Sequence, residues 1–533
     1  MPANNSKTQI YLPLLLSLAL ITGLYAGNFF ASRKVAQTKY IVYRGNEKIN
    51  QVLHYIQSEY VDSISEEQLS EAAIIAMIDS LDPHSVYIPA RELTALNEPL
   101  EGSFSGIGIQ FNMNNDTIVI IKTIANGPSE KTGLLAGDRI IKIEDSIVAG
   151  KNLDTDLIMK KLKGKKGTKV KVSIQRGDLP ELIDYVIVRD NIPLYSIDVS
   201  YMVAPGIGYI KISEFSRKTA EEFRHAVRNL LHKGMQKLIL DLRGNGGGYM
   251  NAAIEIADEM LPEGKLIVYT QGRRNPRNNF MATRNGMLKN TEIAVLIDEW
   301  SASASEIIAG AIQDNDRGKI IGRRSFGKGL VQQQIMLNDG SAIRLTIARY
   351  YSPTGRSIQK PYTKNKNDYY SELGSRYEHG EFFEKDSIHL PDSLKYTTPG
   401  GNTVYGGGGI MPNIFIPQDT IGVSPYYTKI THKGLIYKFA FTYADKNREK
   451  LKTYNDVASL EKYLDTQDLL AQLVDYASRN GVEKNDAEIN KSTQIIHTQL
   501  KANIARNILD NEGYYPIISR IDRTLQKCIE ILK

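Results

Sequence analysis

The sequence predicts a multidomain α/β protein with an inserted small β-rich domain and with helical regions at both ends. Three observations support this fold class. A chain of 533 residues is too long for one hydrophobic core. Between residues 202 and 352, apolar strand-like runs alternate with helical patterns, as in a layered sheet-and-helix domain. Between residues 102 and 189 the runs become short and β-branched, and beyond residue 428 apolar residues recur at helical spacing.

The N-terminus carries an apolar segment. Residues 10–31 contain no charged side chain, and about 20 mostly apolar residues suffice to span a bilayer as a helix. The segment exceeds the apolar part of an ordinary signal peptide and lacks a clear cleavage site. We therefore expect residues 1–32 to form a signal anchor or transmembrane segment. More Lys and Arg follow the segment than precede it, so a simple positive-inside count would leave the rest of the protein in the cytoplasm.

Residues 45–100 are expected to form a helical N-terminal region. Apolar residues of one stripe recur from Ile49 to Ile56, and Ser65 with Gln68 matches a capping box that opens a helix ending near Ser80. The following sequence Leu81-Asp82-Pro83-His84-Ser85 is a turn signal.

Residues 101–190 are expected to form the β-rich domain, with strands near 118–124, 139–143, 170–174 and 186–188 and a helix near 153–162. The loop Phe104-Ser105-Gly106-Ile107-Gly108-Ile109 resembles the PDZ loop that holds a peptide's terminal carboxylate on backbone N–H groups. On its own this loop also fits an ordinary glycine-containing hairpin. Further turns at Gly127-Pro128, Gly133-Leu134 and Gly137-Asp138 follow in PDZ order and favour a PDZ domain.

The α/β core is expected at residues 198–360, and a loop-rich region at 361–427 completes it. Its strands are predicted at 207–212, 237–241, 293–297 and 319–321, and its helices at 218–232 and 249–260. The tyrosine-rich stretch before residue 386 and residues 386–399 are interpreted as loop or linker. Residues 428–533 form a helical C-terminal region, with helices predicted near 468–477, 487–508 and 517–531.

Composition excludes several functions. The 66 Lys and Arg against 60 Asp and Glu leave a net charge of only +6, and no dense basic run with aromatics indicates nucleic acid. The single cysteine, Cys528, rules out an internal disulfide and a cysteine-based metal cluster. The 8 histidines show no paired ligand spacing, so we expect no metal site.

Ser303 is the first candidate for chemistry. It lies in Ser301-Ala302-Ser303-Ala304-Ser305-Glu306, between a predicted strand and a predicted helix. Ser303 and Glu306 match a capping box, which by itself is a structural role. A serine at a helix start also exposes its hydroxyl, and the N–H of Ala304 then lacks an intrahelical partner and is available to an oxyanion.

Lys328 is the second candidate. Residues 322–328 match the G-x-x-x-x-G-K of a phosphate-binding loop, but Gly329 stands where Ser or Thr should hold Mg²⁺, and a strand and hairpin follow instead of a helix. A solvated surface lysine is the commonest alternative. The apolar, glycine-rich surroundings predict burial, a lowered pKa and a neutral amine that can act as a general base.

The glycine run at 241–248, DLRGNGGG, follows a strand and precedes a helix. Its spacing does not fit a dinucleotide site, and the run is interpreted as a turn that supplies a second oxyanion donor. His84 is expected to be structural, not part of a Ser/His/Asp triad.

Five motifs in one order together resemble the carboxyl-terminal processing peptidases, also called tail-specific proteases. They are LDPHSVY (81–87), FSGIGIQF (104–111), DLRGNGGG (241–248), SASASE (301–306) and RSFGKGLVQQ (324–333). The resemblance implies a crotonase-like (ClpP/crotonase-type) peptidase core, with Ser303 as nucleophile, Lys328 as general base and Gln332 orienting the lysine. The N–H groups of Gly248 and Ala304 would form the oxyanion hole.

The sequence departs from the family at two positions. Gly246 replaces a proline that many relatives carry in the glycine motif, and Asn413 stands where aspartate is common.

The resemblance implies an acyl-enzyme serine endopeptidase that needs no metal, nucleotide or other cofactor. Its PDZ domain, through Phe104, Gly106, Ile107, Gly108 and Ile109, would capture the C-terminus of an exported or unfolded protein and gate the active site. Because relatives act outside the cytoplasm, we expect a bacterial cell-envelope protein, anchored in the inner membrane with its catalytic domain in the periplasm, or exported after signal cleavage. The alternatives are a catalytically inactive PDZ scaffold and a crotonase-like acyl-CoA enzyme.

Overall fold

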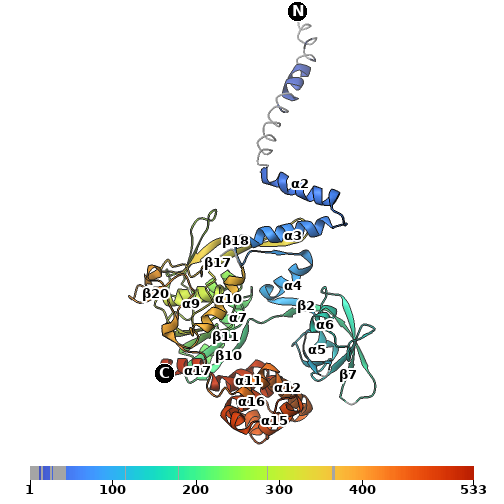
Figure 1. The fold of residues 1–533 in the computed structure, drawn as a ribbon, viewed down its shortest axis with the longest axis vertical. Coiled ribbons are helices and arrows are strands. Elements are labelled where there is room, and N and C mark those ends of the chain that lie inside the picture. Colours follow the sequence, from blue (N-terminus) through green and yellow to red (C-terminus); the bar gives the residue numbers. More distant parts are fainter. Residues whose placement is uncertain are drawn as a thin grey trace, which may run out of the picture. The chain divides into compact units, whose positions relative to one another are not determined.

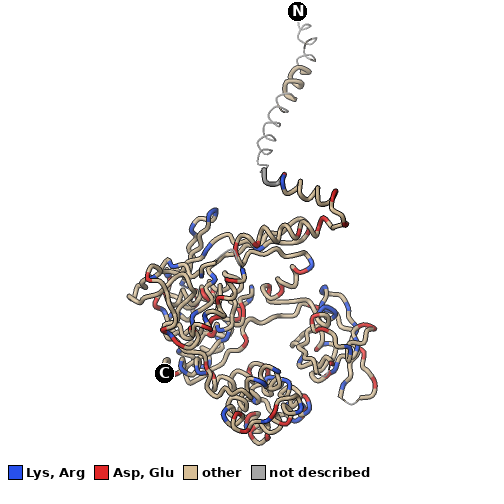
Figure 2. The backbone as a smooth tube through the Cα atoms, viewed as in Figure 1, with Lys and Arg blue, Asp and Glu red and all other residues tan. Residues whose placement is uncertain are grey.

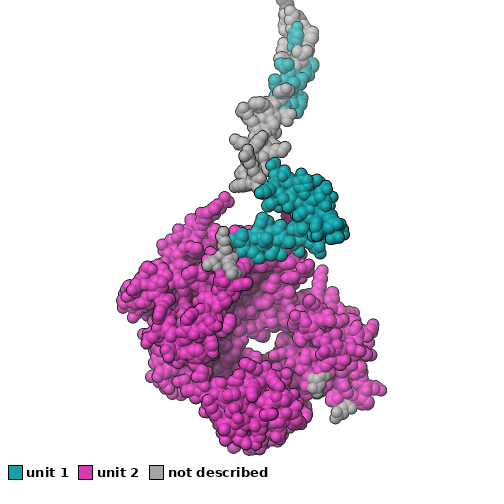
Figure 3. Space-filling view, in the orientation of Figure 1, with its two compact units in different colours: residues 1–80 teal, residues 81–533 magenta. Residues whose placement is uncertain are grey.

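The structure, a computed structural model, describes residues 11, 13, 16–24, 27, 44–114, 116–177, 179–284, 286–362 and 366–533. The chain divides into two compact units, residues 1–80 and 81–533 (Figure 3). Part of the membrane segment predicted for residues 1–32 lies outside the described residues. Among the residues that are described, no helix has both the length and the apolar character needed to cross a membrane.

The described part of the first unit contains α2 (Arg44–Glu59) and α3 (Glu66–Asp79). The side chain of Ser65 accepts a hydrogen bond from the N–H of Gln68 and caps α3, as the sequence predicts.

The second unit opens with the predicted turn, followed by β1 (Val86–Ile88) and α4 (Ala90–Glu101). The strand interrupts a stretch that was expected to be largely helical. It forms because Tyr87 and Ile88 are buried where β1 pairs antiparallel with β18 (Ala342–Tyr351), a partner that local helical spacing does not reveal.

The small β-rich domain follows the prediction. Its antiparallel sheet has the order β3-β4-β5-β7-β8, with β6 on β5 and with β3 as an edge strand. Its strands are β3 (Ile109–Asn114), β4 (Thr117–Thr123), β5 (Arg139–Ile143), β6 (Ser146–Ile147), β7 (Lys169–Gln175) and β8 (Ile183–Val188), and its helices are α5 (Pro128–Thr132) and α6 (Thr155–Leu162). The chain enters and leaves this domain through the antiparallel pair β2 (Ser103–Gly106) and β9 (Asp190–Pro193).

The α/β core is built on a six-stranded sheet (Figure 1). Its order is β10 (Ile197–Ala204), β11 (Ile207–Ile212), β12 (Lys237–Asp241), β15 (Glu292–Ile297), β16 (Lys319–Gly322) and β21 (Ile414–Phe415). Only β10 runs antiparallel to its neighbour. The loops after β12 and β15 therefore leave the same edge of the sheet, where sites of open α/β sheets form.

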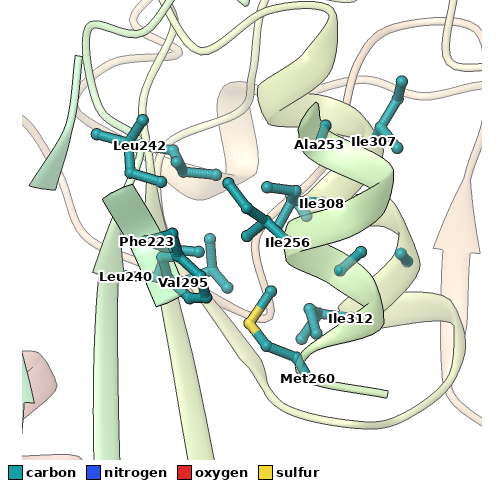
Figure 4. Close-up of a cluster of buried hydrophobic side chains, with 14 of the residues drawn as sticks. Phe223, Leu240, Leu242, Ala253, Ile256, Met260, Val295, Ile307, Ile308 and Ile312 are labelled. Atoms are coloured by element: carbon teal, nitrogen blue, oxygen red, sulfur yellow. The ribbon is translucent and has the colours of Figure 1, made fainter. Parts of the chain in front are cut away.

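Helices cover both faces of this sheet. One face carries α7 (Thr219–His232), α8 (Met250–Asp258) and α9 (Ala304–Asp314), and Phe223, Ile256 and Ile308 pack there with Leu240 and Val295 (Figure 4). The other face carries the C-terminal helix α17 (Arg523–Leu532), whose Leu525 and Cys528 belong to a buried cluster with residues of β11, β12 and β15. The core is thus a three-layer sandwich.

A second, antiparallel sheet borders the core. Its path is β1-β18-β13-β14, with β13 (Leu266–Gln271) and β14 (Asn278–Met281), and β17 (Leu330–Met336) also pairs with β18. The β17–β18 hairpin after Lys328 confirms the predicted strand and excludes the helix that a phosphate-binding loop requires.

The loop-rich region contains more regular structure than expected. Helix α10 (Lys366–Glu378) occupies part of the tyrosine-rich stretch that was interpreted as loop, and that interpretation was wrong there. The reason is tertiary packing, because Tyr369 is buried against the rings of Phe326 and His84. Short 3₁₀ turns and the pair β19 (Lys395–Thr397) and β20 (Thr403–Tyr405) follow.

The C-terminal region is a helical bundle with its own core. Its helices are α11 (Pro425–His432), α12 (Leu435–Lys446), α13 (Arg448–Leu451), α14 (Val457–Leu464), α15 (Leu469–Arg479) and α16 (Asp486–Ile518). The prediction found α15 and α16 but missed α11, α12, α13 and α14. Lys and Arg are interspersed with Asp and Glu along the described backbone, in keeping with the low net charge (Figure 2).

Candidate active site

Ser303 stands at the start of α9 in a strained conformation. Its φ of 56° and ψ of −112° are rare for a residue with a side chain. The preceding turn fixes this conformation: Ser301 Oγ donates to the carbonyl of Leu242 at 2.8 Å, and the N–H of Ala302 donates to the carbonyl of Asn245 at 3.0 Å. Strain held by its surroundings in this way is typical of functional positions.

The glycine loop packs directly against this turn. A Cβ on Gly247, whose φ is +103°, would lie 2.7 Å from Cβ of Ser303, so only glycine fits there. The side chain of Asn245 spans the loop, with Nδ2 donating to the carbonyl of Ile212 at 3.0 Å and Oδ1 accepting from the N–H of Gly247 at 2.8 Å. These bonds hold the loop even though Gly246 stands where many relatives have proline.

The N–H of Gly248 points away from the neighbouring strand end. The carbonyl of Gly247 accepts from the N–H of Phe215 at 3.0 Å, and in a trans peptide the following N–H points the opposite way. Ala304, the first residue of α9, has an N–H without an intrahelical acceptor. These two backbone N–H groups therefore stay available, and their role in an oxyanion hole stays a prediction.

Lys328 lies half-buried in the loop between β16 and β17. Burial lowers the pKa of its amine, and Arg344 lowers it further, while the charges of Glu306 and Asp82 partly oppose the shift. The amine donates to Oε1 of Gln332 at 3.3 Å. The amine is thus partly shielded from solvent, unlike that of a fully solvated surface lysine, and burial lowers its pKa in the direction that the sequence setting predicts.

Gln332 is oriented by the turn that the sequence placed at 81–85. Its Nε2 donates to the main-chain carbonyl of His84. That turn is held by Asp82, which accepts from the N–H of His84 at 2.8 Å and from Oγ of Ser85 at 2.6 Å. Burial lowers the pKa of His84 to about 4, so the imidazole is neutral and its role is structural, as expected.

Glu306 was recognised from the sequence only as a helix cap, but it connects the two candidate residues. Its buried carboxylate accepts from the N–H groups of Ser303, Gly327 and Lys328, each at 2.8 Å, and from Oγ of Ser325 at 2.6 Å. Burial raises the pKa of this carboxyl and the hydrogen bonds lower it; because burial is the larger effect, the pKa is raised to about 7. Four donors on two oxygens match an ionised carboxylate.

Tyr350 was missed by sequence reasoning. Its buried hydroxyl contacts the carbonyl oxygens of both Ser303, at 3.0 Å, and Lys328. The contacts depend on the register of β18, and no local sequence signal marks them.

Ser303, Lys328, Gln332 and Gly248 all line one cavity of about 620 Å³. Its wall also contains apolar side chains, among them Met250, Ile307 and Leu330. The cavity thus combines a hydroxyl, an amine with a lowered pKa and a backbone N–H donor with space for an apolar side chain. Within the described parts of the chain, no group of three or more His, Cys, Asp and Glu residues is arranged to hold a metal ion.

Comparisons with known proteins identify the domains. The model of peptidase family S41 matches residues 206–368, that of the PDZ domain matches residues 105–185, and that of the N-terminal domain of the activating protease CtpB matches residues 27–91. A family of unknown function matches residues 426–510, the helical bundle.

Two curated relatives are similar over 59% and 60% of the chain. The carboxy-terminal processing protease CtpB of Bacillus subtilis (strain 168) is 36% identical over 317 residues, which are 59% of this chain and 65% of that protein. The carboxy-terminal-processing protease of Bartonella bacilliformis (strain ATCC 35685 / KC583 / Herrer 020/F12,63) is 37% identical over 322 residues, which are 60% of this chain and 73% of that protein. The chain belongs to the carboxy-terminal processing proteases.

The alignment spans just under two thirds of the B. subtilis protease. Among solved structures, the photosystem II D1 C-terminal processing protease matches at 25% identity and a TM-score of 0.37, over 69% of this chain and 86% of that one. The two family models and the curated relatives confirm the predicted family, and with it a multidomain α/β serine-type peptidase that carries a PDZ domain.

The PDZ domain of this protease places its predicted loop next to a free strand edge. Ile107 and Gly108 lie between β2 and β3, and the carbonyl of Ile107 is fixed by the N–H and Oγ of Ser129, at 3.0 and 2.6 Å. Ile109 starts the edge strand β3. Gly106 ends β2, and the ring of Phe104 lies 4.8 Å from Nζ of Lys163.

Proposed function

We propose that Ser303 and Lys328 form the catalytic dyad of this protease, with Gln332 orienting the lysine. The observation that carries the proposal is the convergence of the Ser303 side chain and the buried Lys328 amine on one cavity. The lowered pKa gives the amine a neutral fraction near neutral pH, which a serine nucleophile requires of its base.

The reaction then follows from these groups. Neutral Lys328 takes the Ser303 proton as Oγ attacks the scissile carbonyl, and the resulting ammonium protonates the leaving amine. Water, deprotonated by the again neutral lysine, attacks the acyl-enzyme, and the proton returns to Ser303. We assign the N–H groups of Gly248 and Ala304 to the oxyanion of both tetrahedral intermediates.

The proposed substrates are exported or unfolded proteins cleaved near their C-termini. The PDZ domain would hold the terminal carboxylate on the loop from Phe104 to Ile109, while the substrate chain pairs with the free edge of β3. The apolar residues of the cavity favour an apolar side chain at the cleaved bond.

The core is proposed to be of the crotonase-like type, on the strength of its three layers and the oxyanion donors at strand ends. The proposed location is the bacterial cell envelope, with residues 1–32 as inner-membrane anchor or cleaved signal and the catalytic domain in the periplasm. Fractionation of cells expressing the full chain, with protease added to spheroplasts, tests this location: digestion of the catalytic domain only in disrupted cells would contradict it.

The dyad is tested by assaying the full chain on an unfolded protein with an apolar C-terminus. Ser303→Ala, Lys328→Ala and Lys328→Arg should each lose at least about a hundredfold in kcat/KM, since arginine stays protonated and cannot act as a base. Lys319→Ala, which removes an exposed lysine of the same domain, is the matched control. Activity retained in both alanine variants would refute the dyad, and an inactive wild type would favour the PDZ scaffold.

A further inference from the structure

A second cavity, of about 410 Å³, lies between the PDZ domain and the helical bundle. The PDZ domain contributes Gln110, Ile121, Lys122 and Ala136 from the strands β3 and β4 and the turn before β5. The bundle contributes residues of α12, α13 and α16, together with Lys452. None of the residues that line this cavity lies near Ser303 or Lys328 in the sequence.

The two domains are in firm contact around this cavity. Phe441 of α12 is buried against Val119 and Ile121 of β4. Arg139 of β5 forms an ion pair with Asp445 at 2.7 Å. The Arg139 side chain is partly shielded from solvent, and the Asp445 side chain is almost fully shielded. The cavity therefore belongs to a formed interface, and a ligand within it would contact both domains.

Arg448 in the wall of the cavity is ion-paired with Asp445, but two of its buried nitrogens have no hydrogen-bond acceptor within the described structure. Only 7% of this residue is exposed, yet within the described structure its Nε and Nη2 donate to no acceptor. Oδ1 of Asp445 forms an ion pair with Nη2 at 3.6 Å, a distance beyond hydrogen-bond range. Two buried guanidinium nitrogens without an acceptor cost free energy, and an oxyanion is a partner whose geometry these donors match.

The other charges in the wall are mostly positive. Lys122, Lys452 and Arg506 join Arg448, while Asp510 is the one acidic residue among those lining the cavity and pairs with Lys122. Asp510 itself breaks α16, with a φ of 58° and a ψ of −149°. A strained residue at the rim of a basic cavity is consistent with a binding site.

We propose that this cavity binds a small oxyanion with at least two negative charges, either a phosphate compound or a polycarboxylate. Arg448 supplies the central donors, and Lys122, Lys452 and Arg506 balance the remaining charge. Because Lys122 comes from the PDZ domain and the arginines from the bundle, the bound anion holds the PDZ domain on the bundle.

The experiment titrates the full chain with inorganic phosphate and, separately, with citrate, in a calorimeter at an ionic strength kept constant with sodium chloride. We expect saturable binding of at least one anion. Arg448→Gln should weaken it by about tenfold or more, because it removes charge-assisted hydrogen bonds. Arg506→Gln should weaken it about threefold, since Arg506 is exposed and adds charge without burial. Arg479→Gln, an exposed arginine elsewhere in the bundle, should bind like the wild type.

Hydrogen exchange locates the anion. On binding, amides of β4 and of residues 506–512 should gain protection. Binding of phosphate alone or of citrate alone identifies the source of the oxyanion. Any one of three results would overturn the proposal: no saturable binding of either anion, equal affinity of Arg506→Gln and Arg479→Gln, or protection confined to other regions. If Arg448→Gln fails to fold, the comparison of Arg506→Gln with Arg479→Gln decides the case.

Discussion

The side-chain amide of Gln332 donates from Nε2 to the main-chain carbonyl of His84, which leaves its Oε1 facing the amine of Lys328 at 3.3 Å. A carbonyl fixes the orientation of the amide because it accepts hydrogen bonds and cannot donate them. The turn built on Asp82 thus sets which end of Gln332 meets the lysine. The oxygen aligns the amine without adding a full negative charge, which would raise the pKa of the amine.

Gln332→Glu tests this relationship. The new carboxylate beside Lys328 should raise the pKa of the amine, so that the rise of kcat/KM with pH moves to higher pH by about one to three pH units. At neutral pH the activity should fall by tenfold or more, because less lysine is neutral. The exposed neighbour Gln333 supplies the control variant Gln333→Glu. A pH profile that is the same in both variants would show that Gln332 does not act on Lys328.

Glu306→Gln should weaken both the fold and the activity. The glutamine side chain has an NH₂ donor in place of one acceptor oxygen, and this donor would face backbone N–H groups that also donate. The free energy of unfolding should therefore fall by about 2–4 kcal/mol. The charge of Glu306 raises the pKa of Lys328, so its loss should lower that pKa and move the remaining pH profile to lower pH. Chemical denaturation and pH-dependent kinetics measure the two effects. Structural damage alone would reduce activity at every pH and leave the profile in place.

The sequence predicted those parts of the site that have local signals. The start of α9 at Ser303 follows from the capping pattern, and the hairpin after Lys328 follows from a strand-like run at 330–337 that leads into Asn338-Asp339-Gly340. Contacts between distant segments left no such signal: the carbonyl of His84 meets Gln332 across 248 residues of sequence. Helix α17 was predicted as a helix, but its packing on the core sheet depends on shape complementarity and not on periodicity.

Gly108→Ala should weaken the capture of substrate C-termini. Gly108 has a φ of +74°, which strains any residue with a Cβ, and a Cβ there would lie 3.0 Å from Cδ1 of Ile192, so that side chain must also give way. Binding of an apolar peptide with a free C-terminus, measured on the full chain with Ser303→Ala, should weaken by about tenfold.

Gly150→Ala is the matched control for this prediction. Gly150 lies in the same domain and has a φ of +67°, but a Cβ there meets no atom within 4 Å. A peptide with an amidated C-terminus should bind weakly to every variant. Equal affinity of Gly108→Ala and Gly150→Ala for the free peptide would place the carboxylate elsewhere.

Tyr350→Phe removes a hydroxyl that joins the backbones of the two residues of the proposed dyad. The hydroxyl has one proton to share between the carbonyls of Ser303 and Lys328, and its loss should cost about 1 kcal/mol of unfolding free energy. We expect kcat to fall by about tenfold with little change in KM, because small displacements of positioned groups affect the chemical step more than binding. Tyr351→Phe is the control, since Tyr351 stacks on Tyr269 with ring centroids 4.8 Å apart. If Tyr350→Phe instead raised KM and left kcat unchanged, the hydroxyl would serve substrate binding and not the alignment of the dyad.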